Sequence, residues 1–396
     1  MKKIGILFDA DRKNGGSFQM SINNLLAMIK NFKKLKLQIV ILVDKKNLEL
    51  KNLNLKYQIV KFSVSNYFFL IISQMPIIKN SFNRFNFVSS FEKKIIKNNI
   101  NLLIFFSTNW KALLLKKTAF VTTVLDVCHV DFWKKKKFKE ISLVVFHIRE
   151  YLYKTILPLA FRVIVESKDL KFKITKLYKL RLNSIISIPN LPSYFLKKKK
   201  INKLEIERIK IKYNLPEKFY FYPAQFWEHK NHLVILEVIK NFKFNKKNIN
   251  FVFCGSDKGY LANIQNKISE YGIEKNIRIL NYVNEFELFV LYRLCEAMVM
   301  PSYFGPTNIP PIEAWFLKVP VLYSSLNRGH GQNACLYFNA DSSTQLSRAI
   351  LKLNYKKKKL VNKGIVRFKE IKIENTSGHK TLAHDIKFLN RSLKVY

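Results

Sequence analysis

Short apolar runs alternate with longer helical patterns along most of this sequence, and that alternation limits the fold more than any other feature. The run Ile4–Phe8 predicts a first strand, after which Ile22, Leu25 and Ile29 recur at the spacing of one helix face. Further apolar runs predict strands over residues 38–43, 102–106, 119–124, 162–166 and 185–188. Strands that alternate with helices in this way are typical of α/β domains built around a parallel sheet.

A second series with the same order of elements follows. Its predicted strands are 219–223, 249–254, 277–280, 297–300 and 319–323, and its predicted helices are 231–242, 261–271, 285–295 and 311–317. A chain of 396 residues also exceeds what one hydrophobic core usually serves. The length and the two series together predict two domains.

Turn residues and charge mark the boundary between the two predicted domains. Pro189–Pro192 is rich in turn residues, and Lys197–Lys200 is a polar run with nothing to bury. Within a single domain, the same segment would be a surface loop. We predict an N-terminal domain over 1–192, a linker over 193–205, a C-terminal domain over 206–375, and a helix over 376–396 that packs back on the first domain.

Basic residues outnumber acidic residues by a wide margin, with 70 Lys and Arg against 27 Asp and Glu and a formal net charge of +43. Such a charge attracts polyanions or an anionic lipid surface. Lys, Asn, Ile and Phe are abundant throughout, which is also the pattern of an AT-rich coding bias. Nucleic-acid-binding domains concentrate charge on a recognition element and interleave aromatic residues for stacking. The sequence contains no such element, so no specific nucleic acid is expected.

Cysteine spacing and hydropathy exclude further classes. Cys128, Cys254, Cys295 and Cys335 form no CxxC pair, which argues against a zinc site and against a disulfide framework. No uncharged apolar stretch reaches the roughly 18 to 20 residues of a membrane span. Asp9 interrupts the first apolar run before a signal-peptide core is complete. The sequence therefore predicts a cytoplasmic protein.

One segment combines a buried strand, a turn and a helix start in a way that suits anion binding. Residues 300–314 read MPSYFGPTNIPPIEA, in which Pro310 and Pro311 stand where a helix is expected to begin. The free N–H groups at such a helix start, with the helix dipole behind them, favour a diphosphate. Glu313 is placed in the first helical turn, where its carboxylate can accept hydrogen bonds from ribose hydroxyls. An ordinary helix-start carboxylate is the alternative.

This segment resembles the group 1 glycosyltransferases, a retaining family with an E-x7-E motif, in the GPTNIPPIEA variety associated with bacterial surface-polysaccharide synthesis. The resemblance implies the GT-B form of the α/β class, in which two Rossmann-like parallel-sheet domains face a central cleft. Glu313 matches the second Glu of the motif, which binds the nucleotide ribose in that family. The first Glu is replaced by Gly305, which disfavours a covalent mechanism through that carboxylate.

The stretch YPAQFWEHKNH at residues 222–232 also resembles the family. Lys230 matches a lysine whose charge compensates the departing diphosphate, whereas Gln225 stands where the family usually has an arginine. Glycine turns follow two predicted strands at positions where the family's backbone approaches its substrates. The resemblance implies a donor-binding set made of Gly15, Gly16, Gln225, Lys230, Gly255, Gly305, Pro306, Thr307, Asn308, Ile309 and Glu313.

A third resembling segment is VTTVLDVCHVD at residues 121–131, where relatives place polar residues that face the donor sugar. The family's usual histidine before the aspartate is Leu125 here, so His129 is the candidate imidazole. Asp126 is expected to orient His129 or to contact an acceptor hydroxyl. With Lys230, these two residues form the predicted catalytic set, and a structural role for a histidine at a strand end is the alternative.

The resemblance implies that a sugar is moved from a nucleotide-diphosphate sugar to a hydroxyl of a glycan or lipid-linked glycan, with retention and without a metal ion or cofactor. Such chemistry serves surface-polysaccharide or O-antigen-type synthesis. The basic segment Lys134–Lys137 is expected to contact anionic lipid at the inner face of the cytoplasmic membrane. The alternatives are a nucleotide-sugar 2-epimerase of the same fold, a transferase that has lost activity, and a non-catalytic polyanion-binding protein.

Overall fold

The computed structural model describes residues 3–11, 15–74, 87–135, 142–198, 202–305 and 308–392. The chain divides into two compact units, of which the first comprises residues 1–133, 141–189 and 374–396 and the second comprises 134–140 and 190–373. The change of unit after Pro189 falls inside the turn-rich segment that marks the predicted boundary. The predicted linker is partly helical, because α9 (Lys203–Lys212) begins inside it, with Asn202 in a capping box.

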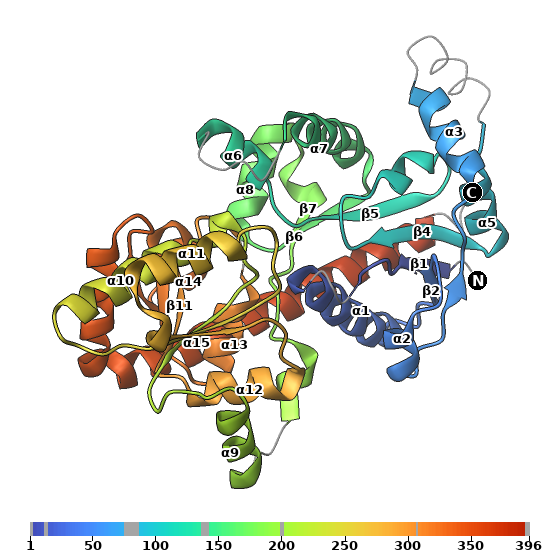
Figure 1. The fold of residues 1–396 in the computed structure, drawn as a ribbon. Coiled ribbons are helices and arrows are strands. Elements are labelled where there is room, and N and C mark those ends of the chain that lie inside the picture. The colour runs from blue at the N-terminus through green and yellow to red at the C-terminus, as the bar shows by residue number, and fades with distance from the viewer. Residues whose placement is uncertain are drawn as a thin grey trace. The chain divides into compact units, whose positions relative to one another are not determined.

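Seven parallel strands form the sheet of the first unit (Figure 1). They are β1 (Lys3–Leu7), β2 (Ile39–Val43), β3 (Gln58–Ile59), β4 (Ile100–Phe105), β5 (Ala119–Val124), β6 (Arg162–Val165) and β7 (Ile185–Ser187). Their order is β3-β2-β1-β4-β5-β6-β7, and the strands predicted here are confirmed with small shifts of their ends. The sequence did not indicate β3, because this strand has two residues and both are exposed, which leaves no apolar pattern.

Helices connect the strands of this sheet and bury one face each. They are α1 (Gly16–Lys34), α2 (Leu48–Asn52), α3 (Val64–Gln74), α5 (Ser90–Lys97), α6 (Cys128–Lys135), α7 (Leu143–Ile156) and α8 (Lys168–Tyr178), with the short 3-10 helix η2 (Trp110–Leu114) before β5. In α1, Ile22, Leu25, Met28 and Phe32 are fully buried. The helix face predicted from the spacing of Ile22 and Leu25 therefore does face the core.

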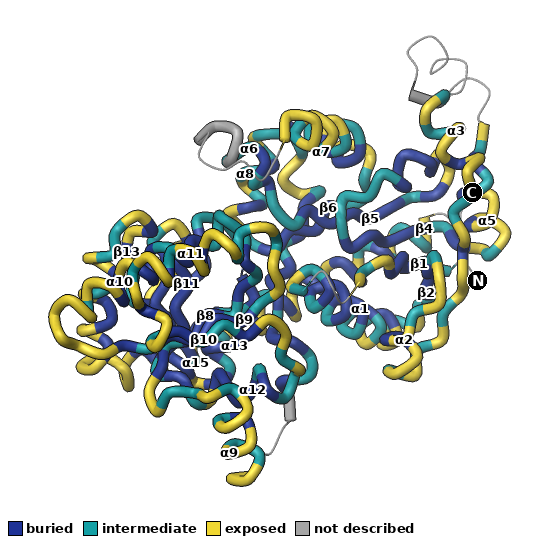
Figure 2. The backbone as a smooth tube through the Cα atoms, viewed as in Figure 1, coloured by how far each residue is buried: buried dark blue, intermediate teal, exposed yellow. Residues whose placement is uncertain are grey.

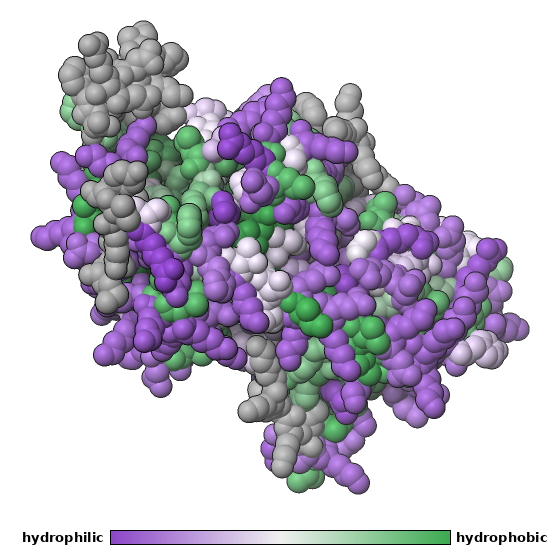
Figure 3. Space-filling view, turned by 180° about the vertical axis from the view of Figure 1, so that it is seen from behind, coloured by the Kyte–Doolittle hydropathy of each residue, from purple (hydrophilic) through white to green (hydrophobic). Residues whose placement is uncertain are grey.

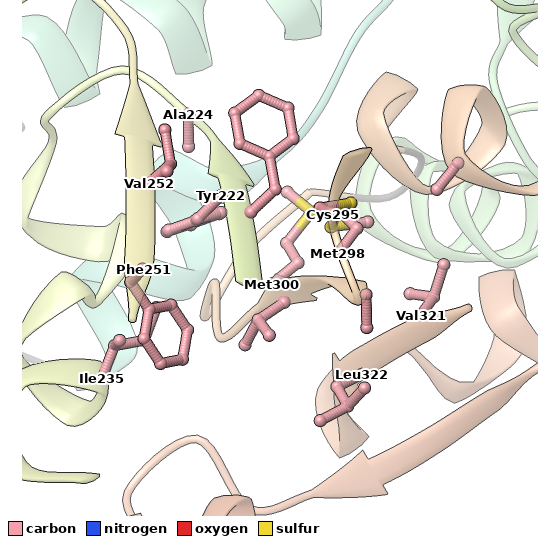
Figure 4. Close-up of a cluster of buried hydrophobic side chains, with 14 of the residues drawn as sticks. Tyr222, Ala224, Ile235, Phe251, Val252, Cys295, Met298, Met300, Val321 and Leu322 are labelled. Atoms are coloured by element: carbon pink, nitrogen blue, oxygen red, sulfur yellow. The ribbon is translucent and has the colours of Figure 1, made fainter. Parts of the chain in front are cut away.

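Six parallel strands form the sheet of the second unit. They are β8 (Tyr220–Pro223), β9 (Phe251–Cys254), β10 (Ile277–Leu280), β11 (Ala297–Met300), β12 (Val321–Ser324) and β13 (Cys335–Phe338), in the order β10-β9-β8-β11-β12-β13. The connecting helices are α10 (His232–Phe244), α11 (Leu261–Tyr271), α12 (Glu285–Leu294), α13 (Ile309–Phe316) and α14 (Arg328–Gly331). Figure 4 shows part of the core, in which Met298, Met300, Val321 and Leu322 of the central strands lie among buried side chains from β8 and β9.

The chain ends in one continuous helix, α15 (Ser343–Ser392). The segment predicted as a helix over 376–396 is the last part of this element, which starts more than thirty residues earlier. Residues up to Ile373 belong to the second unit and the rest to the first. Lysine clusters and Gly364 mask the helical pattern in the sequence, but Gly364 is a packing contact, since a Cβ there would lie 2.7 Å from Trp315 Cδ1.

Three absences hold for the residues that the structure describes. No helix among them is long and apolar enough to cross a membrane. No group of three or more His, Cys, Asp or Glu side chains among them is arranged to hold a metal ion. The four cysteines are free thiols, and Cys254, Cys295 and Cys335 are buried. Figure 2 shows the buried strands of both sheets in dark blue and the exposed outer helix turns in yellow.

Candidate functional site

The strand order of the second sheet reverses between β8 and β11, since β9 and β10 lie on one side and β12 and β13 on the other. In open parallel sheets, ligands bind beyond the carboxyl ends of the strands at such a reversal. The loops that leave the sheet there are residues 224–231 and 301–308. These two loops carry most of the predicted donor-binding residues, so the fold brings together segments that lie about eighty residues apart in the sequence.

Hydrogen bonds join the two loops directly. The Tyr303 N–H donates to the carbonyl of His229 at 3.1 Å. Asn231, which adopts a left-handed φ of 57° before α10, donates through Nδ2 to Pro301 O at 3.4 Å and to Ala340 O at 2.7 Å. The bonds to His229 and Pro301 fix the loop after β8 against the loop after β11, and the bond to Ala340 ties Asn231 to the residues after β13.

Lys230 lies in this junction as the last residue of the 3-10 turn Glu228–Lys230, directly before α10. Its carbonyl accepts a hydrogen bond from the Tyr222 hydroxyl at 2.7 Å, which ties the turn to β8. Next to it, His232 is fully buried, and burial together with the charge of Lys230 lowers its pKa to about 3. His232 is therefore neutral near pH 7, and Lys230 supplies the positive charge at the start of α10.

Gln225 and Gly255 meet where the loops after β8 and β9 approach each other. Gln225 donates through Nε2 to Ser256 Oγ at 3.1 Å and accepts through Oε1 from Trp227 Nε1 at 3.2 Å. A Cβ at Gly255 would lie 2.3 Å from the carbonyl oxygen of Ala224. Glycine is therefore required here by the close approach of two backbones.

Gly305 and Asn308 form the end of the loop after β11, while the predicted Pro306 and Thr307 lie outside the described residues. Gly305 has a φ of +131°, and a Cβ on it would lie 2.4 Å from Asn308 Oδ1. Asn308 is buried, and its Nδ2 donates to the Tyr323 hydroxyl at 2.8 Å. Ile309, also predicted for the donor site, is the first residue of α13 and is buried.

A hydrogen-bond chain continues from Asn308 into the protein. The Tyr323 hydroxyl, which accepts from Asn308, also forms a hydrogen bond with His330 Nδ1 at 3.2 Å, and the tautomer of the imidazole sets which of the two groups donates. Burial and the charge of Arg367 lower the pKa of His330 to about 3, which keeps the ring neutral and able to accept. The His330 carbonyl in turn accepts from Arg367 Nε at 2.9 Å. Sequence reasoning missed Tyr323, His330 and Arg367, although Tyr323 stands near the end of a predicted strand.

Glu313 is placed differently from the prediction. Because α13 begins at Ile309 and not at the second proline, Glu313 lies in the second helical turn. Its side chain is 4% exposed and accepts hydrogen bonds from the Ser193 hydroxyl and from the Tyr292 hydroxyl at 2.9 Å. Burial raises the pKa of Glu313, although these hydrogen bonds oppose that effect. Ribose binding by Glu313 remains a prediction, and a ribose hydroxyl would share the carboxylate with these two partners.

The first sheet has its own reversal, between β1 and β4. Asp9 follows β1 and accepts through Oδ2 from Asn109 Nδ2 at 2.7 Å. Close by, the buried Lys111 pairs with Asp44, which follows β2. Desolvation raises the pKa of Asp9, with Lys111 acting in the opposite direction. None of these four residues was singled out as a site residue from the sequence.

The predicted Gly15 and Gly16 also lie after β1. Gly15 has a φ of 56° and is the residue that precedes the first turn of α1, and Gly16 is the first residue of that helix. The left-handed φ explains the glycine at position 15. Their contact with a substrate remains a prediction.

Asp126 and His129 follow β5, but they do not contact each other as one alternative expected. Asp126 Oδ1 accepts from Arg149 Nη2 at 2.8 Å and from Cys128 N at 3.0 Å. Burial would raise the pKa of Asp126, but the Arg149 charge and these bonds lower it overall. The expected orientation of His129 by Asp126 is therefore wrong, because α6 begins at Cys128 and turns the imidazole toward α7.

His129 has no exposed surface and pairs through Nε2 with Glu150 Oε1 at 2.9 Å. The Tyr178 hydroxyl donates to the same carboxylate oxygen at 2.7 Å. Burial lowers the pKa of His129. Contact of this ring with a substrate remains a prediction, whereas its contacts within the protein place it between α6, α7 and α8.

The part of the chain that contains the loops after β8 and β11 matches a known protein family. Residues 205–362 match the family described as Glycosyl transferases group 1. The chain is also similar to the O-antigen chain mannosyltransferase RfbU of Salmonella typhimurium, with 29% identity over 136 residues. That match covers 34% of this chain and 38% of the mannosyltransferase, so it spans less than half of either protein.

Solved structures share the fold over nearly the whole length. A glycosyltransferase from Rickettsia africae has a TM-score of 0.71 at 16% identity, covering 98% of this chain and 99% of that one. Anabaena HepE, in complex with UDP-glucose, has a TM-score of 0.67 at 12% identity, covering 98% and 99%. WaaG, a glycosyltransferase involved in lipopolysaccharide biosynthesis, has a TM-score of 0.65 at 11% identity, covering 96% and 98%. The predicted GT-B fold is confirmed.

Proposed function

We propose that this chain, whose residues 205–362 match the group 1 glycosyl transferases, moves a sugar from a nucleotide-diphosphate sugar to a hydroxyl of a glycan or lipid-linked glycan. The O-antigen mannosyltransferase and the lipopolysaccharide enzyme among the similar proteins favour an acceptor used in surface-polysaccharide synthesis. The nucleotide belongs at the second sheet, beyond the carboxyl ends of β8 and β11.

The junction of the loops after β8 and β11 is the observation that carries this proposal. It holds Lys230 at the start of α10 beside the loop after β11, whose backbone is bonded to Asn231 through Pro301 and to His229 through Tyr303. A lysine and the N–H groups of a helix start are a suitable pair of groups for a diphosphate. In this proposal they balance the charge of the leaving group, and no metal ion or cofactor is needed there.

The transfer proceeds with retention in this proposal. The bond between the anomeric carbon and the diphosphate oxygen breaks, and the acceptor oxygen forms its bond on the same face of the sugar. The proton of the acceptor hydroxyl goes to an oxygen of the departing phosphate. Catalysis then consists mainly of placing the two substrates and stabilising the developing negative charge, which fits a site that has Gly305 in place of a carboxylate.

We assign the acceptor to the first unit, at the reversal between β1 and β4. Asp9 and Asn109, hydrogen-bonded to each other at 2.7 Å, offer a carboxylate and an amide to sugar hydroxyls. Lys111 and Asp44 lie behind this pair and contribute charge that acts on Asp9. The protein would work at the inner face of the cytoplasmic membrane, and the side chains of Lys134–Lys137, expected to contact lipid, lie outside the described residues.

Two measurements test the function. Thermal unfolding in the presence of UDP, GDP, ADP and their sugars should show a rise in Tm with one nucleotide and its sugar, because a ligand that binds the folded state stabilises it. Incubation of that donor with and without glycan or lipid-linked acceptors should then show sugar transfer only when an acceptor is present. Release of free sugar from the donor alone would favour a 2-epimerase. No Tm response to any nucleotide, together with tight and salt-sensitive binding of DNA, would instead favour a polyanion-binding protein.

A further inference from the structure

Helix α3 presents an apolar face to solvent. On the side of the molecule that Figure 3 displays, hydrophilic residues cover much of the surface, with patches of hydrophobic residues among them. Val64, Phe68 and Ile71 recur at helical spacing, with exposed fractions of 70%, 62% and 60%. The sequence of α3, VSNYFFLIISQ, contains no charged residue. An apolar stripe with this spacing normally packs against a core.

A buried asparagine fixes which face of α3 points outward. Asn66 is 1% exposed, and its Oδ1 accepts from Phe91 N at 3.0 Å and from Ser90 Oγ at 2.8 Å. On the inner side, Phe69 and Leu70 pack against the core of the first unit. Asn66 thus holds α3 against the start of α5, and Phe69 and Leu70 turn its other side to the core. These contacts leave the apolar stripe facing outward.

The helix next to α3 carries exposed lysines. Helix α5 exposes Lys93, Lys94 and Lys97 to solvent. Lys94 donates through Nζ to the carbonyl of Lys61 at 3.2 Å, which places it beside the residues that lead into α3. The exposed apolar stripe and a group of positive charges therefore lie on neighbouring helices.

The acidic residue of these two helices does not compensate the lysines. Glu92 is fully buried, and its carboxylate accepts hydrogen bonds from the backbone N–H groups of Lys116, Lys117 and Thr118 at 2.8 to 2.9 Å. Its negative charge is held inside the protein by these bonds. The outer side of α3 and α5 thus combines apolar contact area with excess positive charge.

We infer that this α3–α5 surface, defined by Val64, Phe68, Ile71, Lys93, Lys94 and Lys97, docks on an anionic lipid bilayer. Apolar side chains of an amphipathic helix insert into the boundary between headgroups and acyl chains, and adjacent lysines bind anionic headgroups. A second copy of the chain is a poorer partner, because a symmetric contact would bring the same lysines against one another. Helix α7 also exposes apolar residues, but its basic side chains are paired with acidic ones, Arg149 with Asp126 and Lys154 with Glu150.

The inference deepens the proposed function and rests on it in one respect: a bilayer contact through the first unit would bring a lipid-linked acceptor to the unit to which the acceptor is assigned. Vesicle binding can be measured without any enzyme activity. Nucleotide binding can be measured without vesicles. The two proposals therefore fail separately.

The experiment is co-sedimentation of the full chain with two kinds of vesicle, one of phosphatidylcholine and one that also contains phosphatidylglycerol. The apolar variant is the double substitution Phe68→Ser and Ile71→Ser, and the charge variant is Lys93→Gln and Lys97→Gln. Matched controls are Phe244→Ser, at a residue 88% exposed on the second unit, and Lys218→Gln, at another exposed lysine. Unfolding curves verify that each variant is folded.

We expect the wild-type chain and both controls to bind anionic vesicles and to bind neutral vesicles weakly. The apolar variant should bind about tenfold more weakly, because it loses inserted side chains, and the charge variant should lose about tenfold or more through its two lysines. Absence of vesicle binding by the wild type, or equal binding by wild type and apolar variant, would overturn the inference. So would a concentration-dependent dimer in sedimentation velocity that the apolar variant abolishes without any vesicle binding.

Discussion

The side-chain amide of Asn308 occupies the space that a side chain at Gly305 would need, with Asn308 Oδ1 2.4 Å from the position of a Cβ on residue 305. Residue 305 is the position that corresponds to the first glutamate of the E-x7-E motif, which this segment resembles. The buried amide, held by the Tyr323 hydroxyl at 2.8 Å, and the glycine are therefore linked features of one loop. At this position the chain has no carboxylate, and the amide of Asn308 fills the space that the side chain of residue 305 would take.

Gly305→Ala should weaken donor binding by about tenfold, because the new Cβ adds a clash with Asn308 to the strain of a positive φ. Gly259→Ala is the matched control, since Gly259 has a φ of +93° but no atom within 4 Å of a Cβ position. The double substitution Gly305→Ala with Asn308→Ala should recover part of the loss, with a coupling of about 1 kcal/mol. Calorimetric titration with the donor compares the wild type, the two single variants Gly305→Ala and Asn308→Ala, the double variant, and the Gly259→Ala control. Purely additive losses would contradict the steric link between residues 305 and 308.

Glu313→Gln should change how stability depends on pH. Burial raises the pKa of Glu313 in the folded state, so the folded protein holds this proton more tightly than the unfolded chain does. The stabilising effect of protonation is present below the ordinary pKa of a glutamate and is lost as pH rises through the raised value. The Tm of the Gln variant minus the Tm of the wild type should therefore increase as the pH rises from about 4 to neutral.

Thermal unfolding of both proteins across that range gives the comparison. Glu296→Gln, which replaces a carboxylate on the protein surface paired with Lys357, serves as control. A constant Tm difference between wild type and Glu313→Gln at all pH values would rule out a raised pKa. Donor affinity of the same variant tests ribose binding, for which loss of a charged acceptor predicts about a tenfold decrease.

Lys230→Met should lower kcat/KM about a hundredfold, because it removes the positive charge that the proposed function assigns to the leaving diphosphate. Lys230→Arg should retain more activity, since the charge is kept. Lys218→Met removes an exposed lysine from the same unit and should leave kcat/KM within a factor of two or so. Initial rates with the donor identified by thermal shift provide the measurement. Equal rates for the Met variant and the wild type would remove Lys230 from the catalytic set.

Asp9→Ala should raise the KM for the acceptor about tenfold and leave donor affinity unchanged, because Asp9 and Asn109 are assigned to acceptor hydroxyls. Asp169→Ala, at an exposed carboxylate in the first turn of α8, is the control in the same unit. Steady-state kinetics with each substrate varied in turn separates the two effects. A parallel loss of donor affinity, or no change in the acceptor KM, would contradict the assignment.

His129→Asn tests whether the imidazole acts on substrate or inside the protein. Its burial and its bond to Glu150 predict a loss of stability of about 1 to 3 kcal/mol, with the kcat of the folded protein reduced only a few-fold. Glu150→Gln should also lower the stability, but by less than His129→Asn does. Urea unfolding and kcat are measured on the same preparations. A kcat loss of a hundredfold or more with unchanged stability would establish the catalytic role predicted from the sequence.

The order of strands and helices was accessible from the sequence because it is encoded locally. Ala119–Val124, Ile277–Leu280 and Ala297–Met300 were predicted with the bounds that the structure has, since each is a compact apolar run between polar segments. β13 and the full length of α15 were not predicted. The four residues of β13 form a strand by pairing with β12, and that pairing is a tertiary event.

The sequence by itself determined the α/β class, the two series of elements and the positions of Lys230, Gly255 and Gly305, because each depends on short-range patterns or on a local backbone requirement. Only the tertiary structure decided the partners of the site residues: Ser193 and Tyr292 for Glu313, Tyr323 for Asn308, and Arg149 and Glu150 for Asp126 and His129. These partners lie from fifteen to more than one hundred residues away in the sequence. Burial and pairing depend on which distant segments the sheet and its helices bring together, and no local pattern records that.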